Sequence, residues 1–294
     1  MRLLLAALCA AVALPAHADD PLLEEAVAFT GQIFHLDNPA PGLVIAAIRD
    51  GESVVLGFGE VARGSGVEPD ADTRIGVGSI TKSFTGLVLA HLAADGTLAL
   101  TDPVGPHLDL GEPMPERDGR APTFLDLATH SGGFRRELLP VEGAEKYSDA
   151  SFAGNLGADA LLFAPGEGIL YSNIGYDLLG MALAGASGRP YGDLLAETVL
   201  DPLGMDTTGY ATPAGAVVFE GYDWTGAPMD AGDPIPNRSG ASGLYTTADD
   251  MVRYLAWNLD RFGAQGAEAR AISHAAWRQR DGMTPAFGMA ESAL

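Results

Sequence analysis

Cysteine is nearly absent from this chain. Its 294 residues include one, Cys9, and that residue lies inside the apolar run from Leu3 to Leu14. The run is too short to span a bilayer, and it stands between the basic residue Arg2 and the small-x-small pattern Ala16-His17-Ala18. We therefore expect residues 1–18 to be a signal peptide. The mature protein would then be periplasmic or secreted, without disulfides and without a thiol nucleophile.

Basic residues are also scarce. The chain has 17 Lys and Arg against 39 Asp and Glu, which gives a formal net charge of −22. This acidity makes nucleic acid and anionic membrane surfaces poor partners. The 6 histidines are scattered without the paired spacing of a zinc site, and no glycine-rich phosphate loop is present. We expect no cofactor, no metal, no nucleic-acid partner and no stable membrane anchor, and the sequence leaves the oligomeric state open.

Lysine occurs only at positions 82 and 146, and the first of these belongs to the motif Ser79-Ile-Thr-Lys82. If a helix begins near Ser79, this spacing places both side chains on one face, one turn apart. A serine hydroxyl needs an adjacent base to be a good nucleophile, and a lysine whose ammonium form is disfavoured by burial can be that base. Such a pair arises by chance in about one sequence in ten, so alone it is only suggestive.

A second motif is Tyr171-Ser-Asn173. A tyrosine phenol near an ammonium group can be drawn toward phenolate and act as a general base. The amide of Asn173 offers a donor and an acceptor, which suits it to hold a substrate amide. The alternative is a loop tyrosine packed on the core, followed by an asparagine that caps a helix. The presence of Ser79 and Lys82 favours the catalytic interpretation.

Together these motifs resemble the serine β-lactamase and penicillin-binding-protein superfamily, whose first element is S-x-x-K. A Tyr-x-Asn second element is similar to the class C branch, which includes class C β-lactamases, related DD-peptidases and β-lactamase-fold esterases. Within that branch the chain most resembles exported DD-carboxypeptidases/endopeptidases of AmpH type. Family-like segments in family order cover residues 75–82, 98–103, 124–133, 200–205 and 239–251.

This resemblance implies an α/β (α+β) fold, in which an antiparallel sheet is flanked by helices and joined to a mainly helical lobe at about residues 80–240. It implies that Ser79 is the acylated nucleophile and Lys82 its proton acceptor. Tyr171 would activate Ser79 or the deacylating water, and Asn173 would bind the substrate amide. The implied function is an exported, penicillin-recognising serine hydrolase acting on peptidoglycan stem peptides. A class C-type β-lactamase or an esterase is the alternative.

The third family element, Lys/His-Thr/Ser-Gly, has no match after Asn173. The letters of His130-Ser-Gly132 fit, but this segment precedes Tyr171 and is a helix end in the family. We therefore expect residues 19–294 to form one β-lactamase-like domain whose C-terminal strands and helix are missing from this chain. The alternative of another class is a truncated, catalytically inactive remnant.

Periodicity predicts the elements that carry these residues. A helix is expected over Leu22–Phe34, and strands over Gly42–Ile48 and Ser53–Phe58 with Asp50-Gly51 as a tight turn between them. The catalytic-motif helix is expected from Ile80 to Leu92. Further helices are expected over 123–133 with a capping box at Thr123, over 173–186, over 191–199, and from Thr247 or Asp249 to Leu259.

Overall fold

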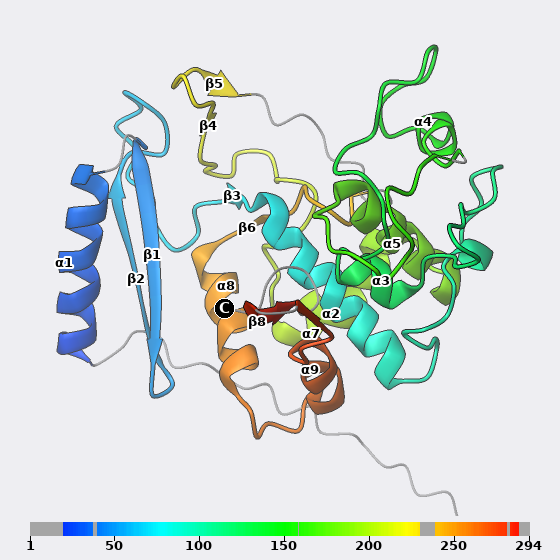
Figure 1. The fold of residues 1–294 in the computed structure, drawn as a ribbon. Coiled ribbons are helices and arrows are strands. Elements are labelled where there is room, and N and C mark those ends of the chain that lie inside the picture. The colour runs from blue at the N-terminus through cyan, green and yellow to red at the C-terminus, as the bar shows by residue number, and fades with distance from the viewer. Residues whose placement is uncertain (1–19, 38–39, 158, 230–238, 281–282, 288–294) are drawn as a thin grey trace, which may run out of the picture. The chain divides into compact units, whose positions relative to one another are not determined.

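The structure is a computed structural model that describes residues 20–37, 40–157, 159–229, 239–280 and 283–287. The described residues form two compact units, divided between Ala71 and Asp72 (Figure 1). Among these residues, no helix is long and apolar enough to cross a membrane. The predicted signal peptide, residues 1–18, lies outside the described ranges, and its existence stays a prediction, as does the single domain over 19–294.

The first unit is a helix packed on a two-stranded antiparallel sheet. Helix α1 (Pro21–Asp37) is followed by β1 (Gly42–Arg49) and β2 (Glu52–Gly59), so the predicted helix and hairpin are confirmed. Its small core is built from Leu23, Val27 and Val54.

The turn of this hairpin has the geometry that its sequence predicts. Arg49 pairs with Glu52, which leaves Asp50 and Gly51 as a two-residue loop. Their φ angles are 55° and 87°. Positive φ at both central residues is what a type I′ turn requires, and Asp-Gly is a preferred pair for it.

The second unit is mainly helical, with α2 (Thr81–Ala94) and α5 (Asn173–Ser187) packed against each other at its centre (Figure 1). Both helices confirm the predicted spans, and each is followed by a left-handed glycine, Gly96 and Gly188. Around them lie α3 (Phe124–Ala128), α4 (Asp149–Gly154), α6 (Tyr191–Leu195), α7 (Asp201–Leu203), α8 (Ala248–Leu259), α9 (Ala267–Ser273), the 3-10 turns η1 (Gly78–Ile80) and η2 (Gly105–His107), and the π-helical turn η3 (Ala196–Leu200).

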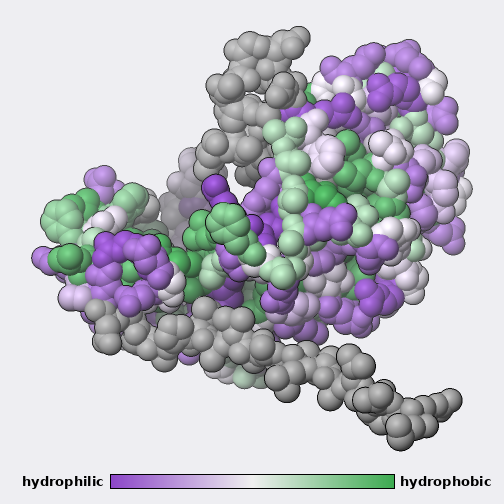
Figure 2. Space-filling model, turned by 90° about the horizontal axis from the view of Figure 1, so that it is seen from below, coloured by the Kyte–Doolittle hydropathy of each residue, from purple (hydrophilic) through white to green (hydrophobic). Residues whose placement is uncertain are grey.

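Short antiparallel pairs complete this unit. They are β3 (Ile75–Gly76) with β6 (Tyr245–Thr246), β4 (Gly221–Tyr222) with β5 (Pro228–Met229), and β7 (Arg278–Arg280) with β8 (Met283–Phe287). The main hydrophobic core is formed by buried side chains of α2 and α5, among them Phe84, Val88 and Leu179. Hydrophilic residues cover much of the described surface in Figure 2, as the large net charge leads one to expect.

Helix α3 is shorter than predicted. The capping box between Thr123 and Asp126 is confirmed, but the helix ends at Ala128 rather than near residues 131–133. The next turn departs from helical geometry because His130 has a φ of 57°, in the left-handed region that interrupts a right-handed helix. This early end redirects residues 129–133 toward the site described below.

Helix α5 lies very close to η2 at Gly185. A Cβ built on Gly185 would stand 2.0 Å from the carbonyl oxygen of His107. A glycine in a helix interior normally costs about 1 kcal/mol relative to alanine, so its presence here reflects this close approach.

We predict that Gly185→Ala destabilises the protein by about 1–3 kcal/mol, because the backbone of His107 must move to relieve the contact. The measurement is the free energy of unfolding in urea. Gly209→Ala is the matched control, since a Cβ there would meet no atom within 4 Å. Equal stabilities of the Gly185 and Gly209 variants would contradict this account of the packing.

Candidate active site

Ser79 and Lys82 meet at the start of α2. Ser79 lies in the 3-10 turn η1, which runs directly into the helix, so the two side chains are one turn apart. The Nζ atom of Lys82 donates a hydrogen bond to Ser79 Oγ over 3.2 Å. Lys82 is 0% exposed, whereas Ser79 is only partly buried. The buried amine therefore contacts a hydroxyl that solvent can reach.

The second motif joins them from α5 and the loop before it. The Tyr171 hydroxyl donates to Ser79 Oγ over 2.6 Å. Asn173 Oδ1 accepts from Lys82 Nζ over 2.8 Å, and the carbonyl oxygen of Ala241 accepts from the same atom over 2.8 Å. All four residues predicted from the sequence, Ser79, Lys82, Tyr171 and Asn173, are thus brought together. Ala241 is an additional partner that the sequence alone did not indicate.

The loop of residues 135–137 fixes the second motif in place. Ser172 caps α5 by accepting from the Gly175 N–H over 2.9 Å, and its hydroxyl donates to the carbonyl of Arg135 over 2.8 Å. The backbone N–H of Asn173 donates to the carbonyl of Arg136 over 2.9 Å. These bonds fix the backbone around Ser172, and so they set the direction in which the side chains of Tyr171 and Asn173 point.

Glu137 holds the other end of the Asn173 amide. Its Oε1 accepts from Asn173 Nδ2 over 2.6 Å and lies 3.5 Å from Arg136 Nε. The Arg136 guanidinium stands 5.0 Å from the ring centroid of Tyr171, a cation–π distance. Sequence reasoning missed both residues, since an Arg-Arg-Glu run carries no motif spacing.

His130 supports Tyr171 from the turn after α3. Its Nδ1 accepts from the Ser172 N–H over 3.1 Å, and its ring centroid lies 4.5 Å from that of Tyr171. The segment 130–132 follows the end of α3 and forms no strand. Its predicted exclusion as the substrate-binding strand is therefore consistent with the structure, although no sequence pattern indicated that His130 reaches the second motif.

Asp177 is a buried carboxyl one turn along α5 from Asn173. It is 4% exposed, and its Oδ1 accepts from the Ala241 N–H over 3.0 Å. Burial raises the pKa of Asp177 from its ordinary 3.8 to about 7, against the opposing effects of the Ala241 N–H and the charge of Lys82. The site thus contains a carboxyl group that titrates near neutral pH.

Among the described residues, no group of three or more His, Cys, Asp and Glu side chains is arranged to hold a metal ion. What the arrangement offers chemically is a hydroxyl nucleophile contacted by an amine and a phenol, either of which can exchange a proton with it.

Comparison with known proteins gives this site a family context. The β-lactamase family model matches residues 21–292. The D-alanyl-D-alanine-carboxypeptidase/endopeptidase AmpH of Escherichia coli K12 is 32% identical over 271 residues, which cover 85% of this chain and 67% of the relative. A β-lactamase of Pseudomonas fluorescens is 27% identical over 253 residues, covering 84% of this chain and 68% of the relative.

Solved structures agree with the predicted fold class. The β-lactamase/D-alanine carboxypeptidase from Yersinia pestis, determined with citrate, superposes with a TM-score of 0.73 at 26% identity, covering 89% of this chain and 76% of that one. The predicted β-lactamase/transpeptidase-like fold, with mixed helix and sheet, is therefore confirmed.

The raised pKa of Asp177 predicts a stability effect with a defined sign. Because the carboxyl binds its proton more tightly in the folded state, its stabilising contribution is complete below about pH 4. That contribution is lost as pH rises through about 7. Asp177→Asn removes this dependence, so the stability of the variant relative to wild type should increase from pH 5 to pH 8, by an amount on the order of a few kcal/mol. Urea unfolding of both proteins at the two pH values measures it. A difference that does not change with pH would show that Asp177 titrates normally.

Proposed function

The chain belongs to the β-lactamase family, and we propose that it is an exported serine hydrolase that forms an acyl-enzyme on Ser79. Members of this family are enzymes. The observation that carries the proposal is the pair of contacts on one oxygen: Ser79 Oγ lies 3.2 Å from Lys82 Nζ and 2.6 Å from Tyr171 Oη. Export is supported by the signal-peptide pattern of residues 1–18.

In the proposed reaction, Ser79 Oγ attacks the substrate carbonyl as its proton passes to neutral Lys82, directly or through Tyr171. The backbone N–H of Ser79, near the start of α2, is one donor to the oxyanion. Collapse of the tetrahedral intermediate breaks the amide bond, and the leaving nitrogen takes the proton. Water, activated by Tyr171, then hydrolyses the acyl-enzyme and restores the Ser79 hydroxyl. Asn173 orients the substrate amide.

The proposed substrate is a peptidoglycan stem peptide, and the proposed activity is DD-carboxypeptidase/endopeptidase. The 32% identity to AmpH over 85% of this chain supports this choice. A β-lactamase activity is the second candidate. It is favoured by the similarity to the Pseudomonas fluorescens β-lactamase and by a tyrosine already hydrogen-bonded to the nucleophile. An esterase on the same scaffold shares the acylation step, because one fold hosts several activities.

Incubation with a penicillin, followed by intact mass measurement, tests the acyl-enzyme. We expect a mass increase equal to the whole penicillin, because opening of the β-lactam ring expels no leaving group. Ser79→Ala should show no increase. Ser83→Ala is the matched control, since Ser83 is only one turn further along α2 and its hydroxyl donates to the carbonyl of Ile80. A wild-type chain with neither an adduct nor turnover of penicillin, or a Ser79→Ala variant with an adduct, would overturn the proposal.

The substrate class is ranked by three assays on the same preparation: release of D-alanine from a D-Ala-D-Ala peptide, hydrolysis of nitrocefin, and hydrolysis of a p-nitrophenyl ester. A DD-peptidase should turn over the peptide and hydrolyse its penicilloyl adduct slowly. Fast nitrocefin turnover with no peptide cleavage would favour the β-lactamase, and fast turnover of the ester alone would favour the esterase.

We also predict that Tyr171→Phe forms the adduct about 10²-fold more slowly, because it removes the hydroxyl that contacts Ser79 Oγ at 2.6 Å. The measurement is the rate of penicillin adduct formation. Tyr222→Phe is the control, because the Tyr222 hydroxyl donates to Glu220, and this variant should react at the wild-type rate. Equal rates for the Tyr171 variant and wild type would remove Tyr171 from the reaction.

A further inference from the structure

We propose that Asp177 is a positioning residue for Lys82, and that it acts through the backbone of Ala241. This inference rests on the proposed function, in which Lys82 is the proton acceptor of Ser79. Its basis is a continuous chain of contacts. Lys82 Nζ donates to the Ala241 carbonyl over 2.8 Å, and the Ala241 N–H donates to Asp177 Oδ1 over 3.0 Å.

Helix α5 therefore holds the Lys82 amine in two ways. Asn173 accepts from Nζ directly. Asp177, four residues further along and hence on the same face of the helix, fixes the Ala241 backbone that supplies another acceptor. Helix α5 thus positions Lys82 directly through Asn173 and indirectly through Asp177, which holds Ala241.

Residues 239–241, called here the strap, contact the first turns of α2 and the first half of α5. The Tyr210 hydroxyl donates to the carbonyl of Ser239 over 2.8 Å, and Thr85 Oγ1 donates to that of Gly240 over 2.7 Å. A Cβ on Gly240 would stand 2.2 Å from the Tyr176 carbonyl, so the strap lies directly against α5. Asp177 is the charged side chain among these anchors. Its loss would leave the buried Ala241 N–H without its acceptor.

Asp177 also affects the charge of Lys82. An ionised carboxylate favours the ammonium form of a nearby lysine, whereas a protonated carboxyl does not. Other groups act on Asp177: the charge of Glu137 raises its pKa, and the charges of Lys82 and Lys146 lower it. Burial raises the pKa of the Tyr191 and Tyr210 phenols so that they remain neutral, and the charge of Asp177 raises both further.

Two substitutions separate position from charge. Asp177→Asn keeps an oxygen that can accept from the Ala241 N–H but removes the charge. Asp177→Leu removes both. Asp250→Asn is the matched control, because Asp250 is also a buried carboxyl but binds Thr207 and Thr208, away from Lys82.

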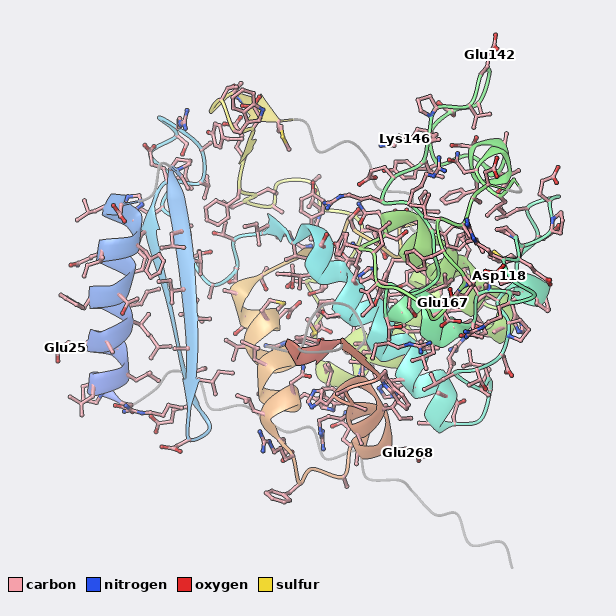
Figure 3. The ribbon with its side chains drawn as sticks, viewed as in Figure 1. Glu25, Asp118, Glu142, Lys146, Glu167 and Glu268 are labelled. Carbon is pink, nitrogen blue, oxygen red and sulfur yellow. The ribbon has the colours of Figure 1, made fainter. Side chains whose placement is uncertain are left out.

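The direct readout is the titration of Lys82 itself, and the composition makes it simple. With two lysines in the sequence, selective ¹³Cε-lysine labelling gives two side-chain NMR signals, and Lys146→Arg assigns them. Figure 3 shows Lys146 on the loop before α4, where it is exposed. In Asp177→Asn the midpoint of the Lys82 signal should fall by about 0.5–1 pH unit, and in Asp250→Asn it should stay at the wild-type value. A wild-type midpoint in both Asp177→Asn and Asp177→Leu would overturn the inference.

The kinetic readout is the pH dependence of penicillin adduct formation. In Asp177→Asn the acid limb should move to lower pH with little change in the plateau, because the acceptor for Ala241 is retained. In Asp177→Leu the plateau itself should fall at least about tenfold. Wild-type plateaus in both variants would contradict a positioning role. Absence of both adduct and penicillin turnover in wild type would instead reject the proposed function, while the NMR titration would still decide whether Asp177 acts on Lys82.

Discussion

The structure of the site depends on the complete burial of one amine. Lys82 is 0% exposed, and burial of an unpaired ammonium group would cost several kcal/mol. Its Nζ meets the oxygens of Ser79, Asn173 and Ala241 at 3.2, 2.8 and 2.8 Å, which uses the donors of an ammonium group or the donors and lone pair of a neutral amine. The need to satisfy this atom links three distant parts of the chain.

The local structure of each of these three segments brings an oxygen to the Lys82 amine. The 3-10 turn before α2 places Ser79 one turn from Lys82. The loop at residues 135–137 binds the backbone around Ser172 and holds the Asn173 amide from its other end. The strap at residues 239–241 lies against α5 because Gly240 has no side chain. A buried carboxyl, Asp177, accepts a hydrogen bond from the backbone N–H of Ala241 in this strap. The site is therefore a consequence of how the core of the helical unit packs.

Much of this could be predicted from the sequence, because the signals are local. Asp50-Gly51 specifies its turn, Thr123 its capping box, and the spacing of Ser79 and Lys82 the shared helix face. The family resemblance predicted that Tyr171 and Asn173 lie in the same site as Ser79 and Lys82. The supporting residues could not be predicted in this way. His130, Glu137 and Asp177 reach the site through contacts between positions about 36 to 64 residues apart, and no periodicity or motif records such pairings. The early end of α3 depends likewise on a left-handed residue, His130, whose conformation its sequence does not signal.

The central claim is that the buried Lys82 amine activates Ser79. The rate of Ser79 acylation by a penicillin in Lys82→Met tests it most directly, because methionine keeps much of the side-chain length and removes the amine, while Ser79 and Tyr171 remain. Peptide mapping of the modified protein would locate the adduct. The account predicts that modification of the peptide containing Ser79 slows by about 10²–10⁴-fold, the usual contribution of a general base. Acylation of Ser79 at the wild-type rate without the amine would contradict it.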